Sequence, residues 1–533
     1  MITSRSASLL ERQRSAPSWH EASIRPCFVL LADLARTQLN PDASTPAGAY
    51  QRRRPESTVL YRCVQEELET FLLHRAEEAR PVPRFVEREL RKFLECGVLA
   101  HGFLRLRCTE CGESRVLAFA CKGRGFCPSC GGRRMSDTAA HLVDRVLPEA
   151  PIRQWVLSLP YPLRFRLAYD RELLTAVLTV FIRTLFRSLR RRARATWGIR
   201  RTIPGAVTFI QRFGSAANLN IHLHSLLLDG VYTREDNEIR LLRLPPPDDQ
   251  EVARLVATIA RRTQHLLESR GLLDMAHSDD PDEQPLLGAI YGASITQSIA
   301  TGARAGRPVM RLGDRIEVDE IGQLSGPRCA SLNGFSLHAD VAVVARDRKR
   351  LERLCRYVAR PPIATERLTE LPDGRIAYAL KRPWRDGTTH FAFTKHEFIE
   401  KLVALVPAPR ANLVRYHGCF APGSKIRAQV VRDRESERES LPQTEAASPS
   451  GSAARSQVDR PRRLAWADLM KRVFEKDVLE CPHCSGRLKL IATITDPRVI
   501  AAILTCLRLP IRAPPLAPAR PGPALQSDFW PDP

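Results

Sequence analysis

Two histidines separated by a single residue, His222 and His224, lie in the apolar segment formed by residues 220–228. Side chains in a strand alternate between its two faces, so both imidazoles would project to one side, with Ile221 and Leu223 on the other. Two imidazoles about 7 Å apart along one strand face can converge on a single metal ion. The same pattern is also typical of a buried strand with two satisfied histidines, so the pair alone leaves both interpretations open.

A third ligand for such an ion can come from residues 207–213, a second predicted strand that precedes the histidines. If the two strands form an antiparallel hairpin, any register whose paired residue numbers sum to an odd number places Gln211 on the histidine face. His338 is the rival third ligand. An oxygen ligand beside two imidazoles leaves coordination positions open for a phosphate and suits Mg²⁺ or Mn²⁺ better than zinc.

Tyr357 lies at the edge of the apolar stripe of a predicted helix that ends before Pro361. Arg353 and Arg360 stand at helical spacings from it, so they share its side of the helix. A tyrosine on a basic helix face can attack a phosphodiester that the arginines bind. The alternative is a tyrosine at the boundary of an amphipathic helix, with no chemical role.

Four cysteines follow the spacing of a zinc ribbon. Cys108 and Cys111 form one Cys-x-x-Cys pair, and Cys127 and Cys130 form a second pair after fifteen intervening residues. This spacing predicts a structural Zn²⁺ site with four thiolates and no open position, serving folding and DNA contact rather than catalysis. Cys121, between the pairs, is either a spare thiol or an alternative ligand.

A third Cys-x-x-Cys pair, Cys481 and Cys484, provides only half of a metal site. Its missing ligands could be His483, Cys506 or a cysteine from another region of the chain. The sequence leaves open whether this pair binds zinc.

Lys and Arg outnumber Asp and Glu by 82 to 59, which gives a formal net charge of +23. Arginine dominates this excess, and its planar guanidinium recognises phosphate with two parallel hydrogen bonds. A nucleic acid is therefore the expected partner, against the alternatives of a ribosomal protein or a basic enzyme surface. A predicted helix over residues 171–194 ends in arginines that suit either a phosphate-tracking surface or the helix dipole, namely Arg190, Arg191, Arg192 and Arg194.

No apolar run reaches the roughly 18 residues that a membrane-spanning helix needs. Residues 27–32 are apolar but short and are followed by Asp33, a poor signal peptide. We therefore expect a cytoplasmic protein without a membrane partner. The fourteen cysteines should then be reduced thiols or metal ligands rather than disulfides.

Taken together, these motifs resemble the rolling-circle insertion-sequence transposases of the HUH nuclease class, specifically the IS-ninety-one-like and common-region group. The resemblance runs in order from about residue 50 to residue 515, and the first fifty residues lie outside it. The matching segments are residues 125–131 with 133–135, residues 211–214 with His222-Leu223-His224, residues 356–362, residues 415–418 with 420–422, and residues 481–486.

The resemblance implies a DNA strand transferase with an α+β fold, in which helices flank an antiparallel nuclease sheet. His222 and His224 would hold a divalent ion over the scissile phosphate, and Tyr357 would form a 5′-phosphotyrosine link. The substrate would be single-stranded DNA or hairpin element ends, and a homodimer is compatible with the reaction. Many relatives carry two tyrosines four residues apart, whereas Arg353 stands four residues before Tyr357 here, so the chain looks like the single-tyrosine subgroup.

Two other functions fit the same motifs: a plasmid relaxase or replication initiator of the HUH class, and a zinc-ribbon DNA-binding regulator without nuclease activity. The absence of a P-loop motif weakens the helicase-linked versions of the first. The expected organisation is a disordered leader (1–50), a helical and zinc-ribbon DNA-binding domain (51–147), an HUH-type catalytic domain (148–430), a linker (431–462), a small zinc-ribbon-like C-terminal domain (463–512) and a Pro-rich disordered tail (513–533).

Overall fold

The computed structural model describes residues 53–235, 238–272, 284–313, 326–431 and 464–521. The expected leader and nearly all of the expected linker lie outside these residues. The chain divides into Met1–Arg53 and Arg54–Pro533, and the following description concerns the second unit.

A seven-stranded sheet carries the histidine pair near its middle. Its strand order is β15-β4-β5-β3-β10-β9, with β11 also paired to β3, and all its pairings are antiparallel. The histidine strand β5 lies between β4 and β3, so its backbone is hydrogen-bonded on both sides. The strands are β3 (Ile152–Ser158), β4 (Gly205–Phe213), β5 (Leu219–Leu228), β9 (Cys329–Leu332), β10 (Phe335–His338), β11 (Ala342–Val343) and β15 (Val414–Gly418).

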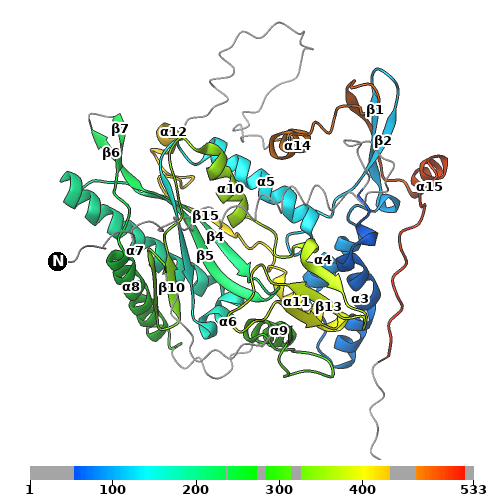
Figure 1. Ribbon diagram of the computed structural model, residues 1–533, viewed down its shortest axis with the longest axis horizontal. Coiled ribbons are helices and arrows are strands. Elements are labelled where there is room, and N and C mark those ends of the chain that lie inside the picture. Colours follow the sequence, from blue (N-terminus) through cyan, green and yellow to red (C-terminus); the bar gives the residue numbers. More distant parts are fainter. Residues whose placement is uncertain (1–52, 236–237, 273–283, 314–325, 432–463, 522–533) are drawn as a thin grey trace, which may run out of the picture. The chain divides into compact units, whose positions relative to one another are not determined.

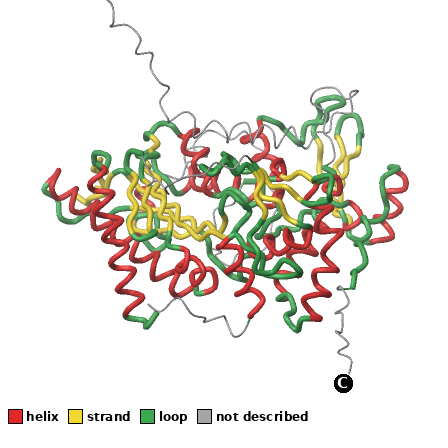
Figure 2. Tube along the Cα trace, turned by 60° about the horizontal axis from the view of Figure 1, so that its bottom comes forward, coloured by secondary structure: helices red, strands yellow, loops and turns green. Residues whose placement is uncertain are grey.

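Helices cover both faces of this sheet (Figures 1 and 2). On one face, α5 (Pro128–Arg145) and α10 (Arg348–Val358) pack beside each other and share a core with Val207, Phe209 and Leu226. On the opposite face, a larger core buries Ile221, Leu223 and Leu227 of β5. The helices of that face are α6 (Tyr161–Tyr169), α7 (Arg171–Trp197), α8 (Asp249–Glu268), α9 (Pro285–Thr296) and α11 (Lys395–Leu405).

A smaller sheet of four strands lies in the same part of the chain, in the order β12-β13-β14-β8. Its strand β14 leads directly into α11, which begins with a capping box between Thr394 and Glu397. The remaining elements here are β6 (Gly230–Glu235), β7 (Glu238–Arg243), β8 (Met310–Leu312), η3 (Thr365–Arg367), β12 (Leu368–Glu370), β13 (Ile376–Ala379), β14 (His390–Phe393) and α12 (Arg427–Val430).

The N-terminal and C-terminal ends of the described chain meet in one three-stranded sheet, ordered β16-β1-β2. The segment expected to form a small separate C-terminal domain therefore contributes its strand β16 to a sheet with β1 and β2 of the N-terminal region. The elements involved are η1 (Pro55–Ser57), α3 (Val59–Glu77), α4 (Arg84–Glu95), η2 (Leu99–His101), β1 (Phe103–Cys108), β2 (Ser114–Ala118), α14 (Trp466–Phe474), β16 (Leu488–Ile494) and α15 (Pro497–Cys506).

Part of the Pro-rich tail lies along α3, in contrast to the disorder expected for residues 513–533. The Gln65 side chain donates to the carbonyl of Pro515 at 2.7 Å, and the Ala517 N–H donates to the carbonyl of Gln65. Arg520 also forms an ion pair with Glu67. Proline fixes an extended backbone, and here that backbone supplies an acceptor and a donor to a helix surface.

The expected mixed α+β architecture with antiparallel sheets is confirmed. Within the described residues, no helix is both long enough and apolar enough to cross a bilayer.

Candidate active site and cysteine clusters

Strand register brings the predicted metal ligands together on one face of the central sheet. Gln211 of β4 pairs with His222 of β5, and residues that oppose each other in an antiparallel pair share a face. His224 lies two residues further along β5 on the same face. His338 is on this face as well, because it pairs with Val156, which pairs with His224.

Hydrogen bonds fix the orientation of both imidazoles, whose ring centroids lie 4.9 Å apart. His222 Nδ1 donates to the carbonyl of Asn220 at 2.9 Å, so the neutral ring keeps a lone pair on Nε2. His224 Nδ1 lies 2.6 Å from Nε2 of the Gln154 side chain, so the amide nitrogen donates to the ring as placed. Exchanging the nitrogen and oxygen of this amide makes Nδ1 the donor and leaves the lone pair of His224 on Nε2, which is the arrangement that a metal ligand needs.

Both histidines are held in the neutral form. Burial, together with the smaller effect of nearby Arg360 and Arg164, lowers the pKa of His222 to about 4 against the opposing hydrogen bond to Asn220. Burial also lowers the pKa of His224 well below its usual value, with His222 and Arg360 acting in the same direction. A neutral imidazole is the form that binds metal, so no deprotonation step is needed at neutral pH.

Three polar atoms on this face are buried without a hydrogen-bond partner among the described residues: Gln211 Oε1, His224 Nε2 and Asn220 Oδ1. The amide nitrogen of Gln211 is occupied, because it donates to the carbonyl of Val358 at 2.7 Å. Leaving buried polar atoms unpaired costs roughly 1–3 kcal/mol each, so such atoms in a native site call for a ligand. One carboxamide oxygen and two imidazole nitrogens fit a divalent cation such as Mg²⁺ or Mn²⁺.

Tyr357 reaches the same place from α10. Its ring centroid is 6.2 Å from that of His224, in an edge-to-face arrangement. The Arg360 guanidinium lies 4.5 Å from the tyrosine ring centroid, and Lys381 Nζ lies 5.6 Å from it. The phenol, the histidine pair and two cations therefore occupy one neighbourhood, which suits an anionic substrate.

The other predicted DNA-contacting arginines occupy different surroundings. Arg190 and Arg192 contact backbone carbonyls, and Arg192 pairs with Glu251 at 3.4 Å, while Arg191 and Arg194 are exposed. All four end α7, whose core lies on the sheet face opposite the histidines. Arg353 is on α10 with Tyr357 and is partly buried.

The predicted cysteine tetrad of Cys108, Cys111, Cys127 and Cys130 is wrong. Cys127 and Cys130 gather instead with Cys96 and Cys121, whose sulfur atoms all lie within 4.8 Å of one another. The reason is the β1–β2 hairpin: Cys108 and Cys111 are at its turn, and the other pair follows its base. A strand of six residues separates the two ends by about 20 Å.

The two cysteines at the hairpin turn find partners far along the chain. Cys108 Sγ lies 3.5 Å from Cys484 Sγ, and Cys111 Sγ lies 3.7 Å from Cys481 Sγ. Of the ligands considered for the C-terminal pair, the structure selects cysteines from another region. Among the described residues, these two tetrads are the groups of histidine, cysteine or carboxylate atoms that gather closely enough for a metal ion.

Comparison with known families identifies two regions of the chain. Residues 64–159 match a family described as "Transposase zinc-binding domain", of the IS91 type, and residues 205–428 match one described as "Putative transposase". The chain is an IS91-type transposase. No curated protein and no solved structure matches it.

These matches agree with the geometry of the transposase. The zinc-binding region includes the cluster of Cys96, Cys121, Cys127 and Cys130, which makes Zn²⁺ a plausible occupant of a closed four-thiolate site. The second matched region includes both histidines, Gln211 and Tyr357. Cys481 and Cys484 lie outside both matches.

The sequence interpretation missed three contributors to the transposase site. Gln154 could have been noticed as a polar residue in an otherwise apolar strand, since its side chain shares the face of His224. Lys381 and Cys96 gave no local signal, because neither belongs to a motif and only the tertiary fold brings each to its cluster.

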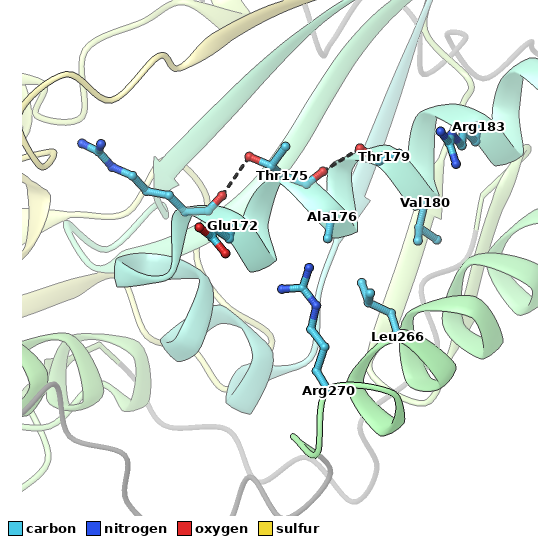
Figure 3. A pocket seen from close by; sticks show the side chains of 9 residues that line it. Glu172, Thr175, Ala176, Thr179, Val180, Arg183, Leu266 and Arg270 are labelled. Carbon is cyan, nitrogen blue, oxygen red and sulfur yellow. Dashed lines mark hydrogen bonds between the residues drawn. The ribbon is translucent and has the colours of Figure 1, made fainter.

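A separate pocket of the transposase lies along α7 and the end of α8, as Figure 3 shows. It has a volume of about 570 Å³ and is lined by Arg171, Thr175, Thr179, Arg183 and Arg270 among others. Its lining contains no histidine, cysteine or tyrosine, and both helices belong to the core opposite the histidine face. We assign no chemistry to this pocket.

Proposed function

We propose that this transposase nicks and rejoins single-stranded DNA at insertion-sequence ends through a 5′-phosphotyrosine intermediate, in the manner of HUH enzymes. The observation that carries the proposal is the position of Tyr357. Its ring centroid lies 6.2 Å from that of His224, above a face on which Gln211 Oε1 and His224 Nε2 are buried and unpaired. A transposase acts on DNA, and this arrangement offers a nucleophile, cations and metal ligands within one neighbourhood.

His222, His224 and Gln211 are the residues that would hold Mg²⁺ or Mn²⁺. The fit rests on the neutral imidazoles and on the unpaired oxygen of Gln211. When bound, the ion would polarise a phosphoryl oxygen and stabilise the charge that develops there. Gln154 and the carbonyl of Asn220 orient the two rings, as outer partners of ligating histidines do.

Tyr357 supplies the attacking oxygen. Its phenol oxygen forms a bond to phosphorus, the bond from phosphorus to the 3′ oxygen breaks, and the phenol proton is lost as the departing 3′ oxygen takes one up. The phosphodiester energy is conserved in the tyrosyl ester, so the reverse attack by a 3′-hydroxyl rejoins a strand. Arg360 and Lys381 hold the anionic backbone beside the phenol.

Arg353 stands four positions before Tyr357, where many relatives of the resembled family carry a second tyrosine. We therefore expect a single tyrosine nucleophile in each chain. A second attack would then come from water, from a 3′-hydroxyl or from the tyrosine of another protomer in a homodimer. The arginine instead adds a cation to the helix that faces the substrate.

The test is formation of a covalent adduct. The purified chain is incubated with single-stranded DNA from the element ends and Mn²⁺, and adducts are resolved on a denaturing gel. Tyr357→Phe should abolish the adduct, whereas Tyr416→Phe should retain it. Tyr416 is the matched control because it pairs with Val207 and so lies on the same sheet face. An adduct that survives in Tyr357→Phe contradicts the assignment, and no adduct with any metal or end sequence favours a DNA-binding regulator.

A further inference from the structure

Two short turns face each other where β16 joins β1. In the first turn, the N–H of Cys108 donates to the carbonyl of Glu113, and Gly112 adopts a φ of 76°. In the second turn, the N–H of Cys481 donates to Gly486, the N–H of Ser485 donates to Cys481, and Ser485 has a φ of 58°. Each turn presents two thiols from one side, which is the local geometry of a metal-binding knuckle.

The sulfur separations distinguish between a metal site and a disulfide. Cys108 and Cys484 are 3.5 Å apart and Cys111 and Cys481 are 3.7 Å apart, whereas a disulfide needs about 2.05 Å. Four sulfurs placed tetrahedrally at about 2.3 Å from a zinc ion lie about 3.8 Å from one another. Cys108 and Cys481 are buried while Cys111 and Cys484 are exposed, so the cluster stands at the protein surface.

We propose that Cys108, Cys111, Cys481 and Cys484 bind a second structural zinc ion, which clasps the C-terminal segment to the N-terminal hairpin. The ligand pairs are some 370 residues apart in the chain. The site lies partly outside the zinc-binding family match, which ends at residue 159. The ribbon is thus a split one, built by β1 and β2 from one end of the chain and β16 from the other.

The clasp is needed because little apolar surface holds the two ends together. Among the described residues, the buried apolar group around the cluster consists of Cys108, Cys481 and Leu488, with Leu106 partly buried against it. A second group at the base of the sheet has four buried members, and Leu490 and Ile491 of β16 stay exposed. A sheet with so small a core needs a metal or another crosslink to stay folded.

The clasped segment also reaches the helix that carries Tyr357. Arg472 of α14 donates to Glu352 of α10 at 2.7 Å and forms a two-pronged contact with Asp144 of α5. One guanidinium therefore ties the two helices that cover the histidine face. Releasing the clasp should free α14 and remove this tie.

The first test counts zinc. The wild-type chain, purified with zinc, should contain two zinc ions per chain, one for each tetrad. The variant Cys481→Ser/Cys484→Ser should contain one. Cys506→Ser is the matched control, since Cys506 lies in the same C-terminal segment but outside both tetrads, and it should keep two. A double variant that keeps two zinc ions, or a wild-type chain with one, overturns the proposal.

The second test addresses the clasp without relying on how the double variant folds. A protease site is inserted between Val431 and Leu464 of the full chain, and the cut protein is run on a sizing column. With zinc bound, the two pieces should elute together, and a chelator should separate them. Pieces that stay together after both zinc ions are removed contradict the clasp.

The third test follows the tie to α10. Hydrogen exchange of Arg348–Val358 should be faster by about tenfold in Cys481→Ser/Cys484→Ser than in wild type. Arg472→Ala should show the same faster exchange while keeping two zinc ions. Unchanged exchange in either variant would show that the C-terminal segment does not support the tyrosine helix. These readouts do not depend on DNA cleavage, so they stand apart from the proposed activity.

Discussion

The histidine face and the cysteine clusters are both candidate metal sites, yet they differ in how they are built. The cysteine clusters gather four sulfurs within 4.8 Å on short turns, so an ion there would have no open position. The histidine face offers two neutral imidazoles and one amide oxygen on rigid neighbouring strands, with a tyrosine above them. It leaves room for a substrate oxygen.

From this difference we infer different roles for the two kinds of site. Soft thiolates in a closed set suit zinc and stabilise chain segments that lack a large core. An oxygen and two nitrogens in an open set suit a harder ion that must exchange water for a phosphate. The comparison predicts that changes at the histidine face affect chemistry and that changes at the clusters affect folding.

The largest effect is expected at His224. His224→Ala should slow adduct formation by on the order of 10³-fold, because the substitution removes one ligand of a three-ligand set. The rate is measured by quenched sampling at saturating Mn²⁺, with circular dichroism as the check on folding.

His417→Gln is the control for His224→Ala. Burial lowers the pKa of His417 to about 4, much as it does for His222, but His417 pairs with Ala206 and so faces the other side of the sheet. Its adduct rate should match wild type. Equal losses in both variants would mean that buried histidines matter here for stability alone.

The next largest effect is expected at the closed cluster. Cys130→Ser should weaken zinc binding by about 100-fold or more and lower the melting temperature, since binding of a structural zinc is coupled to folding. Zinc content and thermal melting measure this. Adduct formation by the folded fraction should stay close to wild type. A Cys130→Ser variant with normal stability but slower adduct formation would contradict a purely structural role for this cluster.

A smaller effect separates Gln211 from its rival His338. Gln211→Leu should weaken Mn²⁺ binding by roughly 10- to 100-fold, because it removes the unpaired oxygen from the histidine face. His338→Leu should change it little. Isothermal titration calorimetry measures the Mn²⁺ affinity of both variants. A larger loss of affinity in His338→Leu than in Gln211→Leu would make His338 the third ligand.

The smallest effect is expected at Gln154, whose side chain forms a hydrogen bond with the ring of His224. Gln154→Leu should weaken Mn²⁺ binding by about tenfold, whereas Gln154→Glu, whose carboxylate offers an acceptor to His224 Nδ1, should retain most of the binding. No difference between the two variants would mean that this side chain does not orient the ring.

The sequence predicted the histidine face well because strand parity is a local rule. Two residues in one strand share a face whenever they are two apart, and pairing with the neighbouring strand carried Gln211 to the same side. Helical periodicity likewise located α10. These signals depend on a few neighbouring residues, so one sequence is enough.

The cysteine pairing could not be predicted in the same way. Spacing along the chain favours Cys108 and Cys111 with Cys127 and Cys130, but the hairpin holds the pairs at opposite ends. The true partners depend on β16 joining β1, a contact between distant segments that no local pattern encodes. Lys381 and Arg472 are invisible for the same reason, because tertiary packing alone gives each its neighbours.

The most direct test of the central claim is to locate the DNA-linked residue itself. The wild-type adduct formed with Mn²⁺ is digested with a protease and a nuclease, and the modified peptide is sequenced by mass spectrometry. The account predicts a phosphotyrosyl nucleotide on Tyr357, whose ring faces the Arg360 guanidinium. A nucleotide on any other side chain, with Tyr357 unmodified, would contradict it.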